Sequence, residues 1–363
     1  MSDRINGDVM LVGSMPYNNA EVVLRKAGRA LSGHAGFLPD GEVGERKNWV
    51  GMLPEHIYSK HPAFEETLAP PGHTLVQPDR DAEGPPLEEI PGIWSFRVKP
   101  GAEVRFDDLR YGSHAIESYR VFRRLRDEGV IDAGVRFQLA IPATCSAIDW
   151  CFENPDDWPT LYRAYNDRIR QEIALALREI PANDLVIQWD VAWEFVDMAV
   201  GDKRLFAFYP HLTAEQKFQR YAAQLDELGQ GIPDETLLGF HWCYGTWGGW
   251  PMVAMSDLSL CVRMSNEAAR RTGRRLDYVH MPVARRPSAE FFAPLSALDI
   301  GDTAVYLGMV HHTDGIHDFR HRRDLARKHL SSFGIAGVCG YGRVDPEELD
   351  HVLDVHAACA AEL

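Results

Sequence analysis

Eight short runs of apolar, β-branched and aromatic residues recur along the 363-residue chain, and segments with helical periodicity lie between most of them. The eight runs are residues 8–14, 36–42, 136–142, 185–190, 236–243, 277–283, 304–310 and 334–340. Parallel strands need long connections, usually helices, so this alternation predicts an α/β fold with a parallel sheet covered by helices. Eight repeats fit one (β/α)8 TIM barrel, and we expect residues 1–363 to form a single domain of this kind.

Residues 50–112 interrupt the alternation. This segment contains many of the prolines and has no clear periodicity, so we expect a long insertion after the second strand, lying over the barrel mouth. The rival fold is a doubly wound open sheet, in which a G-x-G-x-x-G motif often follows the first strand. No such motif follows residues 8–14, and the barrel is therefore favoured.

The charge balance excludes two classes of partner. The chain has 38 Lys and Arg against 53 Asp and Glu, a formal net charge of -15, which repels nucleic acids and anionic membrane surfaces. It shows no cleavable leader and no apolar run of membrane-spanning length, so we expect a cytoplasmic protein. The six scattered cysteines are then expected to be free thiols. A homo-oligomer is compatible with this composition.

Polar residues with reactive side chains follow most of the predicted strands. Active sites of TIM barrels lie at the carboxyl ends of the strands, where the following loops meet. The residues at these positions are Ser14, Asp40, Glu42, Asp190, His241, Cys243, His280, His311, His312 and Cys339. We expect these side chains to converge on one rim of the barrel.

His241, Cys243 and Cys339 are the sharpest subset. Residues two apart in a strand point to the same side, so His241 and Cys243 can reach one atom. Two thiolates and an imidazole are good zinc ligands and leave a fourth position for water or substrate. The alternative is that both cysteines are buried as small apolar residues and His241 is a hydrogen-bonded core residue. Their placement after the fifth and eighth strands favours the metal site.

Motifs along the chain resemble a known family. The segments are "VGSMPY", "DGEVGERKNWV", "IQWD", "HWCY" and "VCGYGR", which lie in family order between residues 12 and 343. They resemble the catalytic C-terminal barrel of cobalamin-independent methionine synthase, within the superfamily that also contains uroporphyrinogen decarboxylase. The resemblance implies that His241, Cys243 and Cys339 bind zinc. It also implies that Ser14 contacts the carboxylate of an amino-acid thiol, whose ammonium group Glu42 and Asp190 hold.

Other readings of these residues stay open. Glu42 and Asp190 are also of the type that caps helices or forms ion pairs. The family has a zinc-binding Glu where this chain has His280, which is either a fourth ligand or a residue behind the ligands that positions them or carries protons. The family also has a proton-carrying His near the seventh strand. His312 is our choice for it, with Asp190 as the other catalytic residue and His311 as a core or interface residue.

The resemblance leaves the alkyl donor open. Trp150 is the nearest match to the family's folate-stacking tryptophan, and Trp242, Trp247 and Trp250 are an alternative stacking surface. The expected function is a zinc-dependent transferase that moves a methyl or alkyl group from methylfolate, methylcorrinoid or another donor to homocysteine or a similar small thiol. Alternatives are an epoxide-opening transferase of the coenzyme M type, a metal-free decarboxylase or lyase, and a non-catalytic barrel stabilised by zinc.

Overall fold

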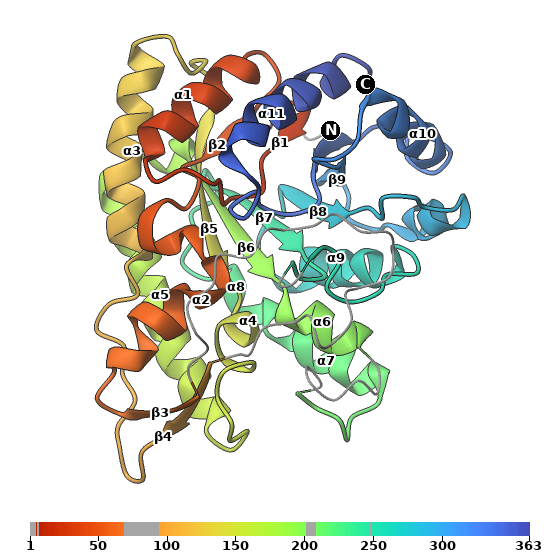
Figure 1. The fold of residues 1–363 in the computed structure, drawn as a ribbon. Coiled ribbons are helices and arrows are strands. Elements are labelled where there is room, and N and C mark those ends of the chain that lie inside the picture. Colours follow the sequence, from red (N-terminus) through yellow and green to blue (C-terminus); the bar gives the residue numbers. More distant parts are fainter. Residues whose placement is uncertain (1–4, 6, 69–93, 201–207, 247–248) are drawn as a thin grey trace.

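The structure, a computed structural model, describes residue 5 and residues 7–68, 94–200, 208–246 and 249–363. Its centre is a sheet of eight strands with helices around it (Figure 1). The strands are β1 (Val9–Met10), β2 (Phe37–Pro39), β5 (Arg136–Pro142), β6 (Leu185–Val191), β7 (Leu237–Trp242), β8 (Tyr278–Pro282), β9 (Ala304–Val310) and β10 (Gly334–Gly337). Each strand overlaps one of the eight predicted runs.

The strand order is β1-β10-β9-β8-β7-β6-β5-β2, and every neighbouring pair is parallel. The two outer strands approach each other at a single parallel bridge between Val9 and Ala35. There the Val9 N–H donates to the His34 carbonyl at 3.0 Å. The sheet is thus nearly closed into a barrel, and the predicted (β/α)8 fold is confirmed.

Helices follow the strands and pack on the outside of the barrel (Figure 1). The longer ones are α1 (Ala20–Ala30), α3 (Tyr111–Asp127), α5 (Trp158–Glu179), α7 (Ala214–Ala223), α9 (Ser259–Arg271), α10 (Ile316–Ala326) and α11 (Pro346–Ala360). The short ones are α2 (Trp49–His56), α4 (Thr144–Ile148), α6 (Trp193–Ala199) and α8 (Leu225–Leu228). The described residues also contain the 3-10 helices η1 (Gly44–Lys47), η2 (Tyr58–Lys60), η4 (Ala182–Asp184) and η6 (Glu290–Ala297).

The connection after β8 is the 3-10 helix η6 rather than an α-helix. Pro294 lies inside this segment and has no N–H for an α-helical hydrogen bond. Within the described part of the chain, no helix combines the length and apolar character needed to cross a bilayer.

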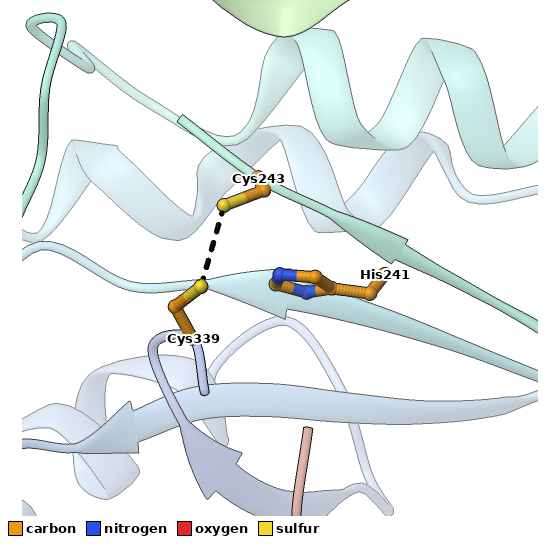
Figure 2. Close-up of side chains that lie close together, drawn as sticks. All are labelled: His241, Cys243 and Cys339. Atoms are coloured by element: carbon orange, nitrogen blue, oxygen red, sulfur yellow. Dashed lines mark hydrogen bonds between the residues drawn. The ribbon is translucent and has the colours of Figure 1, made fainter. Parts of the chain in front are cut away.

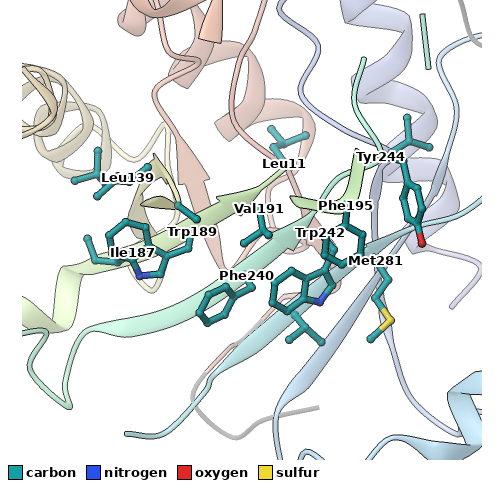
Figure 3. Packing of buried hydrophobic residues seen from close by; sticks show 14 of the residues in the cluster. Leu11, Leu139, Ile187, Trp189, Val191, Phe195, Phe240, Trp242, Tyr244 and Met281 are labelled. Carbon is teal, nitrogen blue, oxygen red and sulfur yellow. The ribbon is translucent and has the colours of Figure 1, made fainter. Parts of the chain in front are cut away.

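Successive residues of each strand face opposite sides of the sheet, as the twofold side-chain period requires. On β6, Ile187, Trp189 and Val191 face the helices, where they pack beside outward residues of β7 such as Phe240 and Trp242 (Figure 3). The alternate residues of the same strands face the barrel interior. Both faces are buried, which explains why the strand runs are apolar almost throughout.

A hydrogen-bonded layer fills the barrel interior below the rim. Gln138 and Gln188 each donate from Nε2 to the Val12 carbonyl at 2.7 Å. Gln188 also donates to Asp190 Oδ1 at 2.8 Å and accepts from the Tyr278 hydroxyl at 3.0 Å. Asp190 is therefore held in place by hydrogen-bonded side chains of the barrel interior rather than by a loop.

The predicted insertion at residues 50–112 has structure of its own. It contains most of α2, then η2 and an antiparallel pair, β3 (Phe64–Leu68) and β4 (Ser95–Val98). The Phe96 N–H donates to the Cys151 carbonyl at 2.8 Å, which ties β4 to the loop after β5. Residues 69–93 lie outside the described residues, so the placement of the insertion over the barrel mouth stays a prediction.

Gly239 provides a test of the interior packing. A Cβ atom at this position of β7 would lie 2.2 Å from two ring carbons of Tyr278. We expect Gly239→Ala to lower the free energy of unfolding by about 1–3 kcal/mol, because buried ring atoms must shift. Urea unfolding of the full chain measures the change. Gly134→Ala is the matched control, since a Cβ there meets nothing within 4 Å, and an equal loss in both variants would contradict this packing.

Candidate active site

A cavity opens at the carboxyl ends of the strands. Six of its lining residues were predicted from the sequence to belong to the site: Ser14, Glu42, Asp190, His241, Cys243 and Cys339. They come from the ends of β1, β2, β6, β7 and β10 or the loops that follow, and are separated by up to 325 positions. The barrel thus brings them to one rim.

His241, Cys243 and Cys339 form a compact group whose potential ligand atoms all lie within 4.8 Å of one another. Figure 2 shows the His241 ring pointing toward the two sulfurs. The sulfurs are 3.6 Å apart, far beyond a disulfide bond, and both cysteines are free thiols. Two thiolates on one tetrahedral zinc ion, with Zn–S bonds of about 2.3 Å, lie about 3.8 Å apart. The two sulfurs therefore already have nearly the spacing of zinc ligands.

The two thiols are hydrogen-bonded to each other. The hydrogen bond between them raises the pKa of Cys243 and lowers that of Cys339. Cysteines bind a metal as thiolates, so metal binding at this pair would release protons.

His280 fixes the orientation and the tautomer of His241. Burial lowers the pKa of His280 well below the ordinary value, so its imidazole is neutral. Its Nε2 lies 2.9 Å from the Gly337 carbonyl, which only accepts, so Nε2 carries the proton. Its Nδ1 is then an acceptor and receives the His241 Nδ1 proton at 2.7 Å. His241 Nε2 consequently presents a lone pair, and this atom is buried with no hydrogen-bond partner among the described residues.

The orphaned His241 Nε2 is the observation that fits a metal ion. A buried imidazole nitrogen without a partner is costly, and a metal beside two thiols would satisfy it. The described residues that could hold a metal are His241, Cys243 and Cys339, without His280. Because both ring nitrogens of His280 already have protein partners, this geometry does not support His280 as a ligand. The geometry favours the other predicted role, in which His280 lies behind the ligand His241 and positions it.

Two buried carboxyl groups, those of Glu42 and Asp190, also line the cavity. Burial raises the pKa of Glu42 to about 8, against the opposing charge of Arg46. Burial and the neighbouring Glu42 raise the pKa of Asp190 well above its ordinary value. Two acids that repel each other in one cavity favour a cation between them, since a cation relieves both the repulsion and the desolvation.

The loop after β2 aims Glu42 into the cavity. Glu42 has a positive φ of 51°, which is uncommon for a residue with a side chain. Asp40 stabilises the turn, because it accepts the Glu42 N–H at 2.9 Å and forms a buried ion pair with Arg46 at 2.6 Å. A Cβ on Gly13 would lie 3.0 Å from Glu42 Oε1, so the absence of a side chain at Gly13 leaves room for the carboxyl group.

The predicted role of His312 gains no support from the structure. His312 is half-buried and is not among the described residues that line the cavity. His311 is buried, as expected for a core residue, with its Nε2 3.0 Å from the Val283 carbonyl and its ring against Trp250. Proton transfer by His312 stays a prediction.

Most of the tryptophans predicted to form a stacking surface are buried in the hydrophobic core. Trp242 and Trp250 are fully buried, and Trp247 lies outside the described residues. Trp150 is also buried, stacked on Trp193 with ring centroids 5.1 Å apart. Of these rings, Trp193 is the one that lines the cavity.

Several lining residues were not predicted from the sequence, among them Trp49, Trp193, Thr246, Met252 and Arg343. All of them lie in segments that follow strands, where the barrel rule places active-site residues. Arg343 even lies inside the quoted "VCGYGR" segment. The directions of their side chains depend on contacts between loops. Their positions along the chain therefore did not distinguish them from other loop residues.

Comparisons with known proteins agree on the fold. No family model and no curated protein matches the chain. A B12-independent methionine synthase from Shewanella sp., solved in complex with selenomethionine, matches with a TM-score of 0.61 and 12% identity over 99% of this chain and 97% of that one. A protein from Listeria monocytogenes, provisionally assigned as a vitamin B12-independent methionine synthase, matches with a TM-score of 0.56 and 12% identity, covering 95% and 85%. At such identity the likeness shows a shared fold.

The contact between His280 and His241 predicts a change in metal affinity. We expect His280→Ala to weaken zinc or cobalt binding by about 10–100-fold, because His241 loses the acceptor that fixes its tautomer. His280→Asn should recover part of the loss, since its Oδ1 can accept the same proton. Competition with a chelating dye measures the affinity. His356→Asn, at another buried histidine with its own partners, is the control, and unchanged affinity in His280→Ala would contradict the assigned role.

Substitutions of Glu42 and Glu45 by glutamine are expected to have opposite effects on the free energy of unfolding at pH 8. Because the pKa of Glu42 is raised from 4.5 to about 8 in the folded protein, folding loses stability as the pH rises from about 4.5 to 8. Glu42→Gln should therefore raise the free energy of unfolding of the metal-free protein at pH 8, by about 1 kcal/mol or more, and change it little at pH 4.5.

Glu45 is the matched control. Despite partial burial, hydrogen bonds from Arg110 and His114 lower the pKa of Glu45 to about 2. Its stabilisation is present above the ordinary pKa and is lost as the pH falls toward 2. Glu45→Gln should therefore destabilise the protein at pH 8. Urea unfolding of both variants at pH 4.5 and pH 8 checks the signs, and a destabilised Glu42→Gln at pH 8 would count against the raised pKa.

Proposed function

We propose that the protein transfers a methyl or other alkyl group to the sulfur of a small thiol, with His241, Cys243 and Cys339 as ligands of a zinc ion. The observation that carries the proposal is the buried His241 Nε2 lone pair beside two thiols, on the wall of a cavity that holds two carboxyl groups. Three protein ligands leave one coordination position for the substrate, as in catalytic zinc sites.

The proposed roles are of two kinds, activation of the substrate thiol and binding of its charged groups. A bound zinc ion would lower the pKa of a substrate thiol and keep the resulting thiolate nucleophilic. Glu42 and Asp190 would bind an ammonium group of the thiol and so orient it. Ser14, in the loop after β1, is the proposed contact for the thiol's carboxylate. The carbon–sulfur bond forms as the carbon leaves the donor, which keeps the bonding electron pair and takes up a proton.

The structural neighbours support the amino-acid character of the substrate. The Shewanella protein was solved with selenomethionine, whose amino-acid end is the same as that of methionine. A homocysteine-like acceptor thiol would place an ammonium group in reach of two acids. The donor, whether methylfolate, methylcorrinoid or another, stays open. The free thiols of this chain suit a reducing compartment, and a cytoplasmic location is part of this proposal.

The alternatives fit the cavity less well. A decarboxylase or lyase for a polyacidic substrate needs a basic cavity, whereas Glu42 and Asp190 would repel such a substrate. A purely structural zinc site needs a fourth protein ligand, and the described ligand group has three members. An epoxide-opening transferase with a sulfonate thiol would leave both acids without a partner.

The proposal predicts about one zinc per chain and a thioether product. Zinc-loaded protein should be incubated with homocysteine and other small thiols against methylfolate, methylcorrinoid and epoxide donors, with the thioether detected by mass spectrometry. Cys243→Ala and Cys339→Ala should lose most of the bound metal, because each removes one of three ligands. Cys261→Ala is the matched control, since Cys261 is buried on α9 and is not in the ligand group. The absence of thioether with every donor would end the transferase proposal.

A further inference from the structure

Arg343 is the cationic side chain among the described lining residues of the cavity, and none of the roles above uses it. It lies in the loop after β10, four residues beyond Cys339. Its Nη2 donates to the Thr246 hydroxyl in the loop after β7. This contact fixes the guanidinium on the same side of the barrel as the His–Cys–Cys group.

The donors of Arg343 are not all satisfied. Its Nε is buried and has no hydrogen-bond partner among the described residues. The ion pairs of the described residues do not include it either, although the charges of Cys339, Cys243 and Glu42 reach it through space. Arg46, by contrast, is paired with Asp40 at 2.6 Å. A guanidinium with five donors in a fixed fork, held by one hydroxyl, therefore has donors left for a ligand.

The loop that carries Arg343 also packs against Ser14, the proposed carboxylate contact. A Cβ on Gly342 would lie 3.1 Å from the Ser14 Oγ, and one on Gly340 would lie 2.3 Å from it. The Tyr341 N–H donates to the Ser14 carbonyl at 2.6 Å. The loop that carries Arg343 thus packs directly against the loop that carries Ser14.

The cavity therefore holds a guanidinium with an unsatisfied Nε–H donor and two carboxyl groups in addition to the sulfurs. This arrangement is complementary to a zwitterion, whose ammonium pairs with the acids and whose anion pairs with the arginine. A neutral thiol or a simple aminothiol would leave the Arg343 donors without a partner in a partly desolvated site, which costs binding free energy.

We propose that Arg343 binds the carboxylate of the acceptor thiol and so restricts the substrate to thiols that carry both an ammonium and a carboxylate group. The inference rests on the proposed thiol-transferase function and adds the residue that recognises the substrate carboxylate. A guanidinium fork can bind a carboxylate through two parallel hydrogen bonds, which a hydroxyl such as Ser14 cannot do.

The test compares thiols that differ by one group. Homocysteine, 3-aminopropane-1-thiol and 4-mercaptobutyrate share the thiol and chain length, but the second lacks the carboxylate and the third lacks the ammonium. Cobalt-loaded full-length protein and its Arg343→Gln, Arg343→Lys and Arg263→Gln variants are titrated with each thiol. The thiolate-to-cobalt absorption band and calorimetry give dissociation constants without any turnover. Arg263, paired with Glu215 on the surface, is the matched control.

We expect Arg343→Gln to raise the dissociation constants of homocysteine and 4-mercaptobutyrate by about tenfold or more, and that of 3-aminopropane-1-thiol by less than about twofold. Arg343→Lys should fall between, because it keeps the charge and loses the fork. Glu42→Gln should give the opposite selectivity, weakening the two amine-bearing thiols. Metal content and thermal unfolding of each variant separate a binding defect from a folding defect.

Two results would overturn the role of Arg343 alone. One is an equal loss for all three thiols or no loss for any of them, while wild-type protein binds them normally. The other is tighter wild-type binding of 2-mercaptoethanesulfonate than of homocysteine, which would assign the anion as a sulfonate. If wild-type protein binds no thiol at all, the proposed function fails as well, so the two failures are distinguishable.

Discussion

The site depends on the parallel register of three neighbouring strands. Asp190 on β6 pairs with His241 on β7, and His241 pairs with His280 on β8, so three inward-facing residues stand side by side at one level of the barrel. The hydrogen bond from His241 to His280 follows from this register, because adjacent parallel strands lie about 4.8 Å apart. It leaves the His241 Nε2 lone pair facing the sulfurs. The metal-binding potential of the cavity is thus a property of the sheet rather than of the loops alone.

The same cavity also brings together ionisable groups that form no ion pair among the described residues. Glu42 and Asp190 are buried side groups with raised pKa values, whereas Asp40 and Arg46, a few residues away, form a complete ion pair. Arg343 adds a cation with donors to spare. Unpaired buried groups cost stability, and they persist where a ligand completes them. The contrast between the completed ion pair of Asp40 and Arg46 and these incomplete groups supports the proposal that substrate binds in this part of the barrel.

Much of this site could be predicted from strand ends. Ser14, Glu42, Asp190, His241, Cys243 and Cys339 follow runs whose composition already indicates buried strands, and the barrel rule brings such positions together. Arg343 escaped because its direction depends on Thr246, a residue 97 positions away in another loop. The choice between the two predicted roles of His280 could not be made from the sequence, because it depends on the Gly337 carbonyl, 57 positions away, which decides which ring nitrogen carries the proton.

The sequence by itself determined the repeating pattern of strands and helices, because periodicity and strand composition are local properties that each segment carries alone. It also determined which reactive residues end the strands. The tertiary structure decided how those residues meet: the closure of the sheet, the 3.6 Å approach of Cys243 and Cys339, the tautomer of His241 and the unsatisfied donors of Arg343. These depend on distances between segments far apart in the chain, and hydrogen-bond partners and buried charges exist only once the barrel has formed.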